Sequence, residues 1–496
     1  MFISRSIFIR ILGPDITGLN SLLNSLIGFL NVAELGIGIA IGYALYLPLS
    51  NNNYKKVNEI MILFKHYYKN LAKIILIFGI IVSFALPFFV KNQVNLFFSY
   101  ACYYLYLINS ALSYLFTYKQ TLIISDQKQY KIVVVSNVTR IIKSIIQCCM
   151  IIFIKSFLLW IIIEVMFNFI GMILVNKKID FEYKDIIDYK SKNDIKHIKK
   201  SNKIIIDNLK NIFIHKIGSF VVFQTDSILI TIFSTLKQTA IYANYTMIIS
   251  SLTGLIANVM GSTMASVGNL IVEESKEKAY HIFKKLYLID HIIAIFICTV
   301  TYNIINQFIT FWVGSEYLFS NNIVIVLILN LYIQISRGSI DRFKDGFGIY
   351  GDIGAPIVES LTNLIFSIVL ANYFGIIGIF IGTIISNIII IEIWKPYILF
   401  KRGFEISILN YIKQTIKILM INFLIMIISN RLFLTISNMI NITNIFINLI
   451  INALIILIIV ILLILIFYSI FDEFKDILKV IDIKKRISSI NYRCRH

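Results

Sequence analysis

The stretch TNIFINLIINALIILIIVILLILIFYS, residues 443–469, contains no Asp, Glu, Lys or Arg. A helix needs roughly 20 apolar residues to cross the hydrocarbon core of a bilayer, so this segment is predicted to be a transmembrane span. Twelve further stretches of similar character precede it, at residues 21–47, 71–90, 94–117, 131–154, 157–175, 211–233, 240–265, 285–308, 320–337, 353–371, 375–394 and 413–430.

The composition supports an all-α polytopic membrane protein. Hydrophobic residues make up 58% of the 496 positions, and the mean hydropathy is +0.81, which is too apolar for a soluble fold of this size. The net charge of +19 lies in the gaps between spans, where it can meet anionic lipid headgroups, and no separate basic patch predicts nucleic-acid binding. The cysteine and histidine spacings predict no metal site, no cofactor and no catalytic centre.

Lysine and arginine alternate between the gaps. Every second gap is basic, and these gaps together hold 37 of the 46 Lys and Arg residues. Because positively charged loops stay in the cytoplasm during insertion, we expect the basic gaps and the C-terminus to lie on the cytoplasmic side of the membrane. The basic gaps are Lys55–Lys73, Lys119–Lys131, Lys177–Lys210, Lys276–Lys285, Arg337–Lys344, Lys395–Lys417 and Lys475–Arg495.

The first twelve residues, MFISRSIFIRIL, are expected to form the outer end of a fourteenth span whose beginning is missing. The following gap, residues 13–20, belongs to the lysine-poor outer side. A cleaved signal peptide is the alternative, but Arg5 and Arg10 interrupt the apolar region and no small-residue cleavage site follows.

The two halves of the chain are similar in pattern. Residues 11–30 align with residues 233–252 at a shift of 222, and each combines a short outer turn with a helix that carries scattered polar residues. This predicts two six-helix lobes in parallel repeat, with a substrate site between them, followed by two C-terminal helices. The expected parts are an N-terminal lobe at 1–175, a linker at 176–210, a second lobe at 211–400, two spans at 401–470 and an amphipathic basic tail at 471–496.

The segment RILGPDITGLN, residues 10–20, is followed by AELGIGIAIGYALYLPLS, residues 33–50. With FWVG at 311–314 and DIGAP at 352–356, these residues resemble bacterial polysaccharide-biosynthesis flippases of the multidrug/oligosaccharidyl-lipid/polysaccharide exporter superfamily. The resemblance covers essentially the whole chain. It implies alternating access and export of an undecaprenyl-diphosphate-linked oligosaccharide for O-antigen, capsule or a related surface polysaccharide.

Two cations in the span at 131–154 are candidate substrate contacts. Arg140 and Lys143 lie near mid-membrane, where snorkelling has little reach. A guanidinium can bind phosphate oxygens in a bidentate fork, which suits a diphosphate. The alternative for Arg140 is a structural ion pair with a carboxylate on another helix, such as Glu164.

Four further charged residues fall in or beside predicted spans. Lys216 is a candidate substrate contact or a side chain that snorkels to the cytoplasm, and Arg10 is a candidate phosphate contact or an interfacial anchor. Glu34 lies beside Gly36 and Gly38, where it is either functional or a hydrogen-bonding group at a tight helix crossing. Asp226 is a candidate for coupling to H⁺ or Na⁺, or the salt-bridge partner of a cation.

Two function classes follow. The first is a flippase for lipid-linked oligosaccharides, and the second is an ion-coupled multidrug or organic-cation antiporter of the same superfamily. An antiporter for cations should present buried carboxylates and aromatic rings, whereas a diphosphate carrier should present cations. Arg140 and Lys143 therefore favour the flippase; a scaffold without transport activity is a third, remote alternative.

The predicted orientation can be tested with single cysteines in a cysteine-free background. Cysteines replacing Asn193 or Lys484 should be shielded from a membrane-impermeant thiol reagent in intact cells, because both lie in basic gaps. Cysteines replacing Asn92 or Ser315 should react. Labelling of position 193 from outside would overturn the orientation.

Overall fold

The computed structural model describes residues 2–31, 37–184, 198, 225–261, 263–349, 354–440 and 442–479, and these form helices with short connections. The chain divides into two compact units. Unit 1 comprises residues 1–243 and 356–364, and unit 2 comprises residues 244–355 and 365–496. The sequence places a boundary in the linker at 176–210, and the domain limits given above stay predictions.

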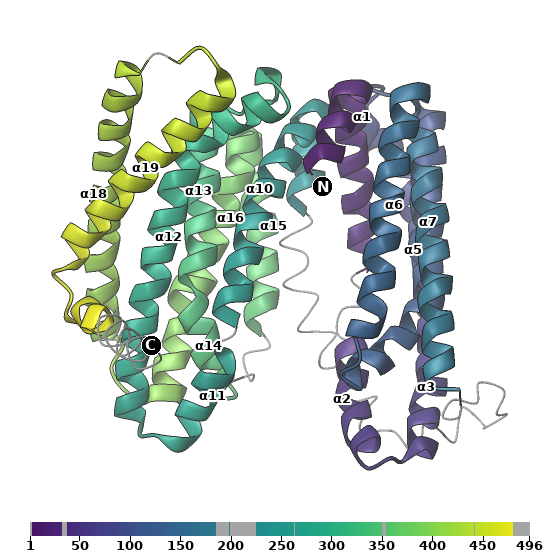
Figure 1. The fold of residues 1–496 in the computed structure, drawn as a ribbon, viewed down its shortest axis with the longest axis horizontal. Coiled ribbons are helices and arrows are strands. Elements are labelled where there is room, and N and C mark those ends of the chain that lie inside the picture. Colours follow the sequence, from purple (N-terminus) through teal and green to yellow (C-terminus); the bar gives the residue numbers. More distant parts are fainter. Residues whose placement is uncertain are drawn as a thin grey trace, which may run out of the picture. The chain divides into compact units, whose positions relative to one another are not determined.

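Unit 1 is built from long helices that pack side by side (Figure 1, purple to blue). Its helices are α1 (Phe2–Leu30), α2 (Ile37–Ser50), α3 (Tyr54–Ser83), α4 (Leu86–Val90), α5 (Leu96–Ser125), α6 (Tyr130–Ile154) and α7 (Phe157–Glu182). Three of them begin at a polar residue whose side chain accepts a hydrogen bond from the first turn: Asn53 for α3, Asn95 for α5 and Ser156 for α7. Such caps satisfy backbone donors that a helix end leaves open.

The first helix corrects one expectation. Residues 13–20, predicted as an outer loop, are helical apart from a break at Gly13, whose φ is 79°. Glycine tolerates this left-handed conformation, and Pro14 with its fixed φ suits the first position of the helix that resumes. The polar residues of this gap therefore lie on a helix.

The second half of the chain has the same break. Residues 225–233 are helical, two residues interrupt the helix, and α10 (Leu236–Gly261) begins. Leu236 follows Pro14 by 222 positions, the shift that aligns the two sequence segments. The repeat predicted from the pattern is therefore matched in the position where each helix restarts.

The core of unit 1 is rich in buried tyrosines. Tyr68, Tyr103 and Tyr114 are fully buried, and the Tyr103 hydroxyl donates a hydrogen bond of 2.8 Å to the Gly79 carbonyl. This contact brings α5 against α3, and a Cβ at Gly79 would overlap the side chain of Leu107. A tyrosine can be buried here because its polar end has a partner.

Unit 2 contains the remaining helices (Figure 1, teal to yellow). They are α11 (Met264–Glu273), α12 (Lys276–Trp312), α13 (Asn321–Ser336), α14 (Gly338–Gly346), α15 (Gly354–Phe374), α16 (Ile376–Asn387), α17 (Lys395–Ile398), α18 (Leu409–Met439) and α19 (Ile445–Tyr468). Residues Ile388–Trp394 and Leu399–Phe404 are π-helical. Helix α10 enters this unit at Asn244, and residues 356–364 of α15 belong to unit 1.

A buried ion pair connects α12 with α14. Arg342 donates hydrogen bonds of 2.9 and 2.8 Å to the two carboxylate oxygens of Asp290, and both side chains are less than 10% exposed. Ser339 donates a further hydrogen bond to Asp290. Charges so far from water persist only when each has a partner, so this pair and its hydrogen bonds fix α14 on α12.

The basic gaps of unit 2 meet one another through ion pairs and a ring contact. Lys276 pairs with Glu405, Lys395 pairs with Asp341, and the Lys417 ammonium lies 4.5 Å from the Phe471 ring centroid. Four of the lysine-rich gaps therefore lie together at one end of this unit, as their assignment to one side of a membrane requires.

The beginning of the C-terminal tail packs on unit 2. Residues 472–479, at the start of the predicted amphipathic tail, are helical, and Phe474 is buried against Tyr468. Lys284 and Lys285 of α12 pair with Glu473 and Asp476 at 3.3 and 3.0 Å. The hydrogen bond from Lys285 lowers the pKa of Asp476. Unit 2 therefore covers Phe471 and Phe474, whereas Leu478 further along the helix is 40% exposed.

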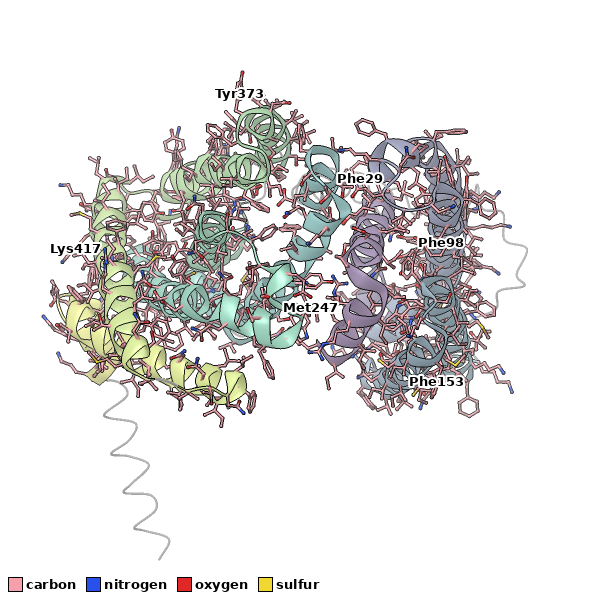
Figure 2. All side chains as sticks on the ribbon, turned by 90° about the horizontal axis from the view of Figure 1, so that it is seen from above. Phe29, Phe98, Phe153, Met247, Tyr373 and Lys417 are labelled. Carbon is pink, nitrogen blue, oxygen red and sulfur yellow. The ribbon has the colours of Figure 1, made fainter. Side chains whose placement is uncertain are left out.

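Nine helices of the described segments are long and apolar enough to cross a membrane. Large apolar side chains cover their outer surfaces: Phe153 of α6 is 83% exposed and Tyr373 of α15 is 79% exposed (Figure 2). Contiguous apolar surface of this extent is favourable only against lipid, so the chain is a multi-pass membrane protein.

Helices α15 and α16 approach closely through small residues. Gly378 and Gly382 lie one turn apart on α16, and a Cβ at Gly382 would come within 2.6 Å of the Ser367 Cα. Small residues spaced in this way let helix backbones touch within a membrane. The Ser367 hydroxyl uses this proximity to donate a hydrogen bond of 2.9 Å to the Ile379 carbonyl.

We predict that Gly382→Val lowers the free energy of unfolding by at least about 1–3 kcal/mol, because the added side chain must separate two helix backbones. Gly254→Val on α10 is the matched control, since a Cβ there meets nothing within 4 Å. Thermal unfolding in detergent should separate the two variants. Equal unfolding midpoints would contradict the close packing.

Candidate functional site

Helices α6 and α7 form the wall of the candidate site. Only Lys155 and Ser156 connect them, and Lys155 adopts a left-handed φ of 52° that ends α6 and reverses the chain. Gly171 of α7 lies against Thr139 of α6, where a Cβ would approach the Thr139 methyl group to 3.2 Å. The two helices are therefore antiparallel and close, which brings the polar residues of α6 opposite α7.

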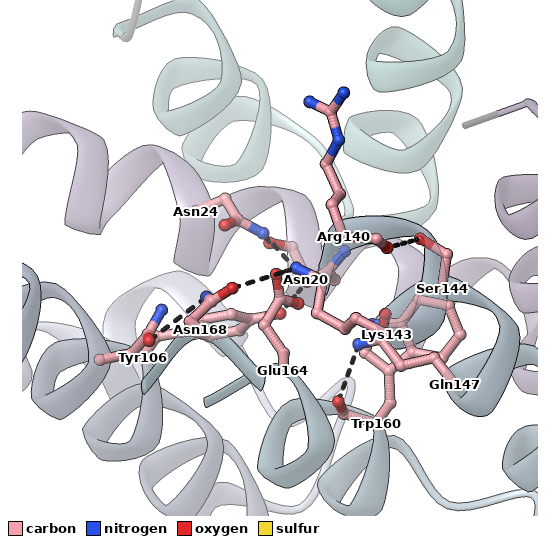
Figure 3. A network of polar contacts seen from close by, with 11 residues as sticks. Asn20, Asn24, Tyr106, Arg140, Lys143, Ser144, Gln147, Trp160, Glu164 and Asn168 are labelled. Carbon is pink, nitrogen blue, oxygen red and sulfur yellow. Dashed lines mark hydrogen bonds and ion pairs between the residues drawn. The ribbon is translucent and has the colours of Figure 1, made fainter. Parts of the chain in front are cut away.

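Lys143 and Glu164 form the ion pair of this wall. The Lys143 ammonium lies 3.0 Å from Glu164 and 3.3 Å from the amide oxygen of Asn168 (Figure 3). The side chains of Lys143 and Glu164 are 15% and 27% exposed, so water screens the ion pair only partly. The sequence suggested Arg140 as the partner of Glu164; in the structure that partner is Lys143.

Arg140 points away from this network (Figure 3). Its Nη2 donates a hydrogen bond of 2.9 Å to the Asn137 side chain on the same helix, and its carbonyl accepts one from Ser144. The residue is exposed, and no carboxylate of the described residues forms a salt bridge with it. Its charge is therefore available to a ligand.

A cavity of about 220 Å³ lies between α5, α6 and α7 within unit 1. Arg140, Lys143 and Asn168 line it together with hydroxyl groups and apolar side chains. The remaining lining residues are Gln120, Ser136, Thr139, Phe167, Gly171, Met172 and Val175. The cavity thus combines one unpaired cation, one paired cation and several hydrogen-bonding groups, a set that can bind an anion with a polar substituent.

A second group of polar side chains continues from Asn168. Asn168 donates a hydrogen bond of 3.3 Å to the amide oxygen of Asn109 on α5. One turn earlier on α5, Tyr106 donates a hydrogen bond of 2.6 Å to Asn20 on α1, and Asn24 also donates to Asn20, at 3.0 Å. Helices α1, α5 and α7 are therefore joined by uncharged polar contacts beside the cations.

The other candidates lie elsewhere. Arg10 is exposed on α1, three residues before Gly13, and does not line the cavity. Asp226 is 7% exposed, and its carboxylate accepts a hydrogen bond of 3.2 Å from Tyr242. Glu34 and Lys216 lie outside the described residues.

Sequence reasoning identified Arg140 and Lys143 but missed the role of the asparagines. The available signal was the number of amide side chains in the apolar spans. An amide side chain in hydrocarbon costs free energy unless it has a hydrogen-bond partner. Asn24, Asn109 and Asn168 each lie within a helical stretch that carries no charged residue within four positions of the asparagine on its C-terminal side. Their partners depend on helix packing, which no spacing within one helix reveals.

No family model and no curated protein sequence matches the chain. Solved structures do match. The lipid II flippase MurJ, in an inward closed conformation, is 17% identical, covers 94% of this chain and 98% of its own chain, and has a TM-score of 0.61. A multidrug resistance MATE family transporter of the MOP superfamily, in an inward-facing conformation, is 11% identical over 79% of this chain and 92% of its own, with a TM-score of 0.56.

The chain shares the fold of these two solved structures. This confirms the predicted all-α polytopic membrane architecture. The two structures are membrane transport proteins, a flippase and a drug transporter, so the fold alone does not separate the two function classes raised by the sequence.

We predict that Lys143→Met destabilises the protein by about 1–2 kcal/mol, because it leaves Glu164 without its cation in a partly screened site. The double variant Lys143→Met with Glu164→Gln should recover most of this loss. Thermal unfolding midpoints provide the measurement.

Lys276 and Glu405 supply the control pair. Their side chains are 46% and 64% exposed, so Lys276→Met should change stability by less than about 1 kcal/mol. A similar effect at both sites would show that the Lys143 pair is not protected from water.

Proposed function

We propose that the protein is a flippase that moves undecaprenyl-diphosphate-linked oligosaccharides across the bacterial cytoplasmic membrane. The observation that carries the proposal is Arg140, a guanidinium at the cavity that pairs with no carboxylate of the described residues and lies about ten residues inside α6. An isolated charge at that depth is costly and is retained only when it serves a ligand or a partner. The phosphates of a lipid diphosphate supply the matching charge.

The cavity charges support an anionic substrate. Lys143 and Glu164 neutralise each other, so Arg140 leaves the wall with a net positive charge. The second candidate function is an ion-coupled antiporter for drugs or organic cations. Such a substrate would be repelled by Arg140 and would require an unpaired carboxylate in its place.

Helices α18 and α19 also support the flippase. The two C-terminal helices carry exposed apolar residues such as Phe423 and Ile458. A long isoprenoid tail could lie against such a surface, while a small drug has no use for it.

Transport against a gradient requires a coupled ion, and Asp226 is the proposed site for H⁺ or Na⁺. It is a buried carboxylate within a predicted span, and Tyr242 already orients one of its oxygens. In this proposal the protein has no enzymatic activity; its direct partners are the lipid-linked oligosaccharide, the membrane lipids and the ion. The basic loops face the cytoplasm.

The test is a complementation assay that measures surface polysaccharide and protein abundance together. Arg140→Ala should abolish surface polysaccharide while abundance stays near normal, because none of the described carboxylates pairs with Arg140 and would be stranded. Arg140→Lys should restore only part of the function, since the planar fork that binds two phosphate oxygens is lost.

Arg431→Ala is the matched control. Arg431 is an exposed arginine on α18 that lies outside the cavity, so its removal should leave polysaccharide unchanged. If Arg140→Ala retains normal surface polysaccharide, Arg140 does not contact the substrate. If Arg140→Ala instead accelerates the export of an organic cation, the antiporter is the better interpretation.

A further inference from the structure

Four asparagines of unit 1 form a connected polar group, and three of them have hydrogen-bonding atoms that no described residue engages. We name Asn20, Asn24, Asn109 and Asn168 the amide track; they come from α1, α5 and α7. The track begins at the cavity, because Asn168 lines it and contacts Lys143. Tyr106 and Asn109 are three residues apart on α5 and share one face, so the track continues to Asn20 and Asn24.

The amide track keeps unused donors and acceptors. An asparagine side chain offers two N–H donors and one oxygen acceptor. Within the described part of the chain, no hydrogen bond engages the amide nitrogens of Asn20 and Asn109 or the amide oxygen of Asn24. These atoms are not sealed inside the core, since Asn24 is exposed and Asn20 and Asn109 are half-buried.

This pattern differs from that of asparagines that only hold helices together. Asn422 of unit 2 is 3% exposed; its nitrogen donates to Tyr332 and its oxygen accepts from Tyr468, at 2.8 and 2.7 Å. Its side chain is therefore engaged on both sides inside the packed core. The amide track, by contrast, presents free groups beside an anion site.

We infer that the amide track binds the hydroxyl groups of a saccharide attached to the anionic group held at Arg140. A sugar hydroxyl is both donor and acceptor, as the free amide groups require, and the track carries no charge that would select an ion. A hydrocarbon tail would leave these groups unpaired, at a cost that disfavours it here. The inference rests on the proposed flippase function and adds the recognition of the sugar.

The adjacency of the two sites matches the order of groups in the substrate. In a lipid-linked oligosaccharide the first sugar is bonded directly to the diphosphate. Arg140 and Asn168 line one cavity, and Asn109 and Asn168 are joined by a hydrogen bond. A diphosphate at Arg140 therefore places its first sugar within reach of the amide track.

The experiment compares two lipids on the purified full chain in nanodiscs. The probes are undecaprenyl diphosphate and the same lipid carrying N-acetylglucosamine or galactose, and the readout is the ratio of their dissociation constants. Each sugar hydrogen bond should strengthen binding by about fivefold. Asn24→Leu and Asn109→Leu should each reduce this ratio by about that factor, whereas Arg140→Gln should weaken both lipids and leave the ratio unchanged.

Asn372→Leu is the matched control, because Asn372 is an exposed asparagine on α15 outside unit 1, bonded only within its own helix. It should leave the ratio as in the wild type, and unfolding midpoints of all variants should confirm that they are folded. A ratio near one for both sugars, or a ratio that the track variants do not change, overturns the inference.

Failure of the proposed function has a different signature. If undecaprenyl diphosphate itself binds no more weakly to Arg140→Gln than to the wild type, the anion site is wrong and the saccharide inference fails with it. If the bare lipid depends on Arg140 but the sugar adds nothing, only the saccharide inference fails.

Discussion

The constraint on which this structure depends is that hydrocarbon cannot hydrogen-bond. A polar group that leaves water for the bilayer must find its partner within the protein, and this requirement makes the described chain helical. It applies equally to side chains. Asp290 with Arg342 and Lys143 with Glu164 are paired for this reason, and Ser339 and Asn168 supply the additional hydrogen bonds that such charges need.

Arg140 departs from this pattern and thereby marks the site. Lys143 lies one turn away on the same helix and has both a carboxylate and an amide partner, while the one side-chain partner of Arg140 in the described part of the chain is the amide of Asn137. The structural role of Lys143, pairing with Glu164, does not account for the second cation, Arg140. The paired lysine stabilises the wall of the cavity, and the arginine provides the charge that the proposed ligand would neutralise.

The sequence predicted much of the fold because hydropathy and charge are properties of single helices. The span expected at 131–154 corresponds to Tyr130–Ile154, and the span expected at 443–469 corresponds to Ile445–Tyr468. The site was predicted only in part. Spacing identified Arg140 and Lys143 on α6, but the choice of Lys143 as the partner of Glu164 depends on the rotation of α7 against α6, which no pattern along one helix contains.

The two-residue connection between α6 and α7 has a consequence for motion. A link of this length, with Gly171 seated on Thr139 and an ion pair further along, leaves these two helices no freedom to slide or separate. They form a stiff hairpin. A change in the width of the cavity would therefore involve its third wall, α5, while Arg140 and Lys143 keep their spacing because they lie one turn apart on α6.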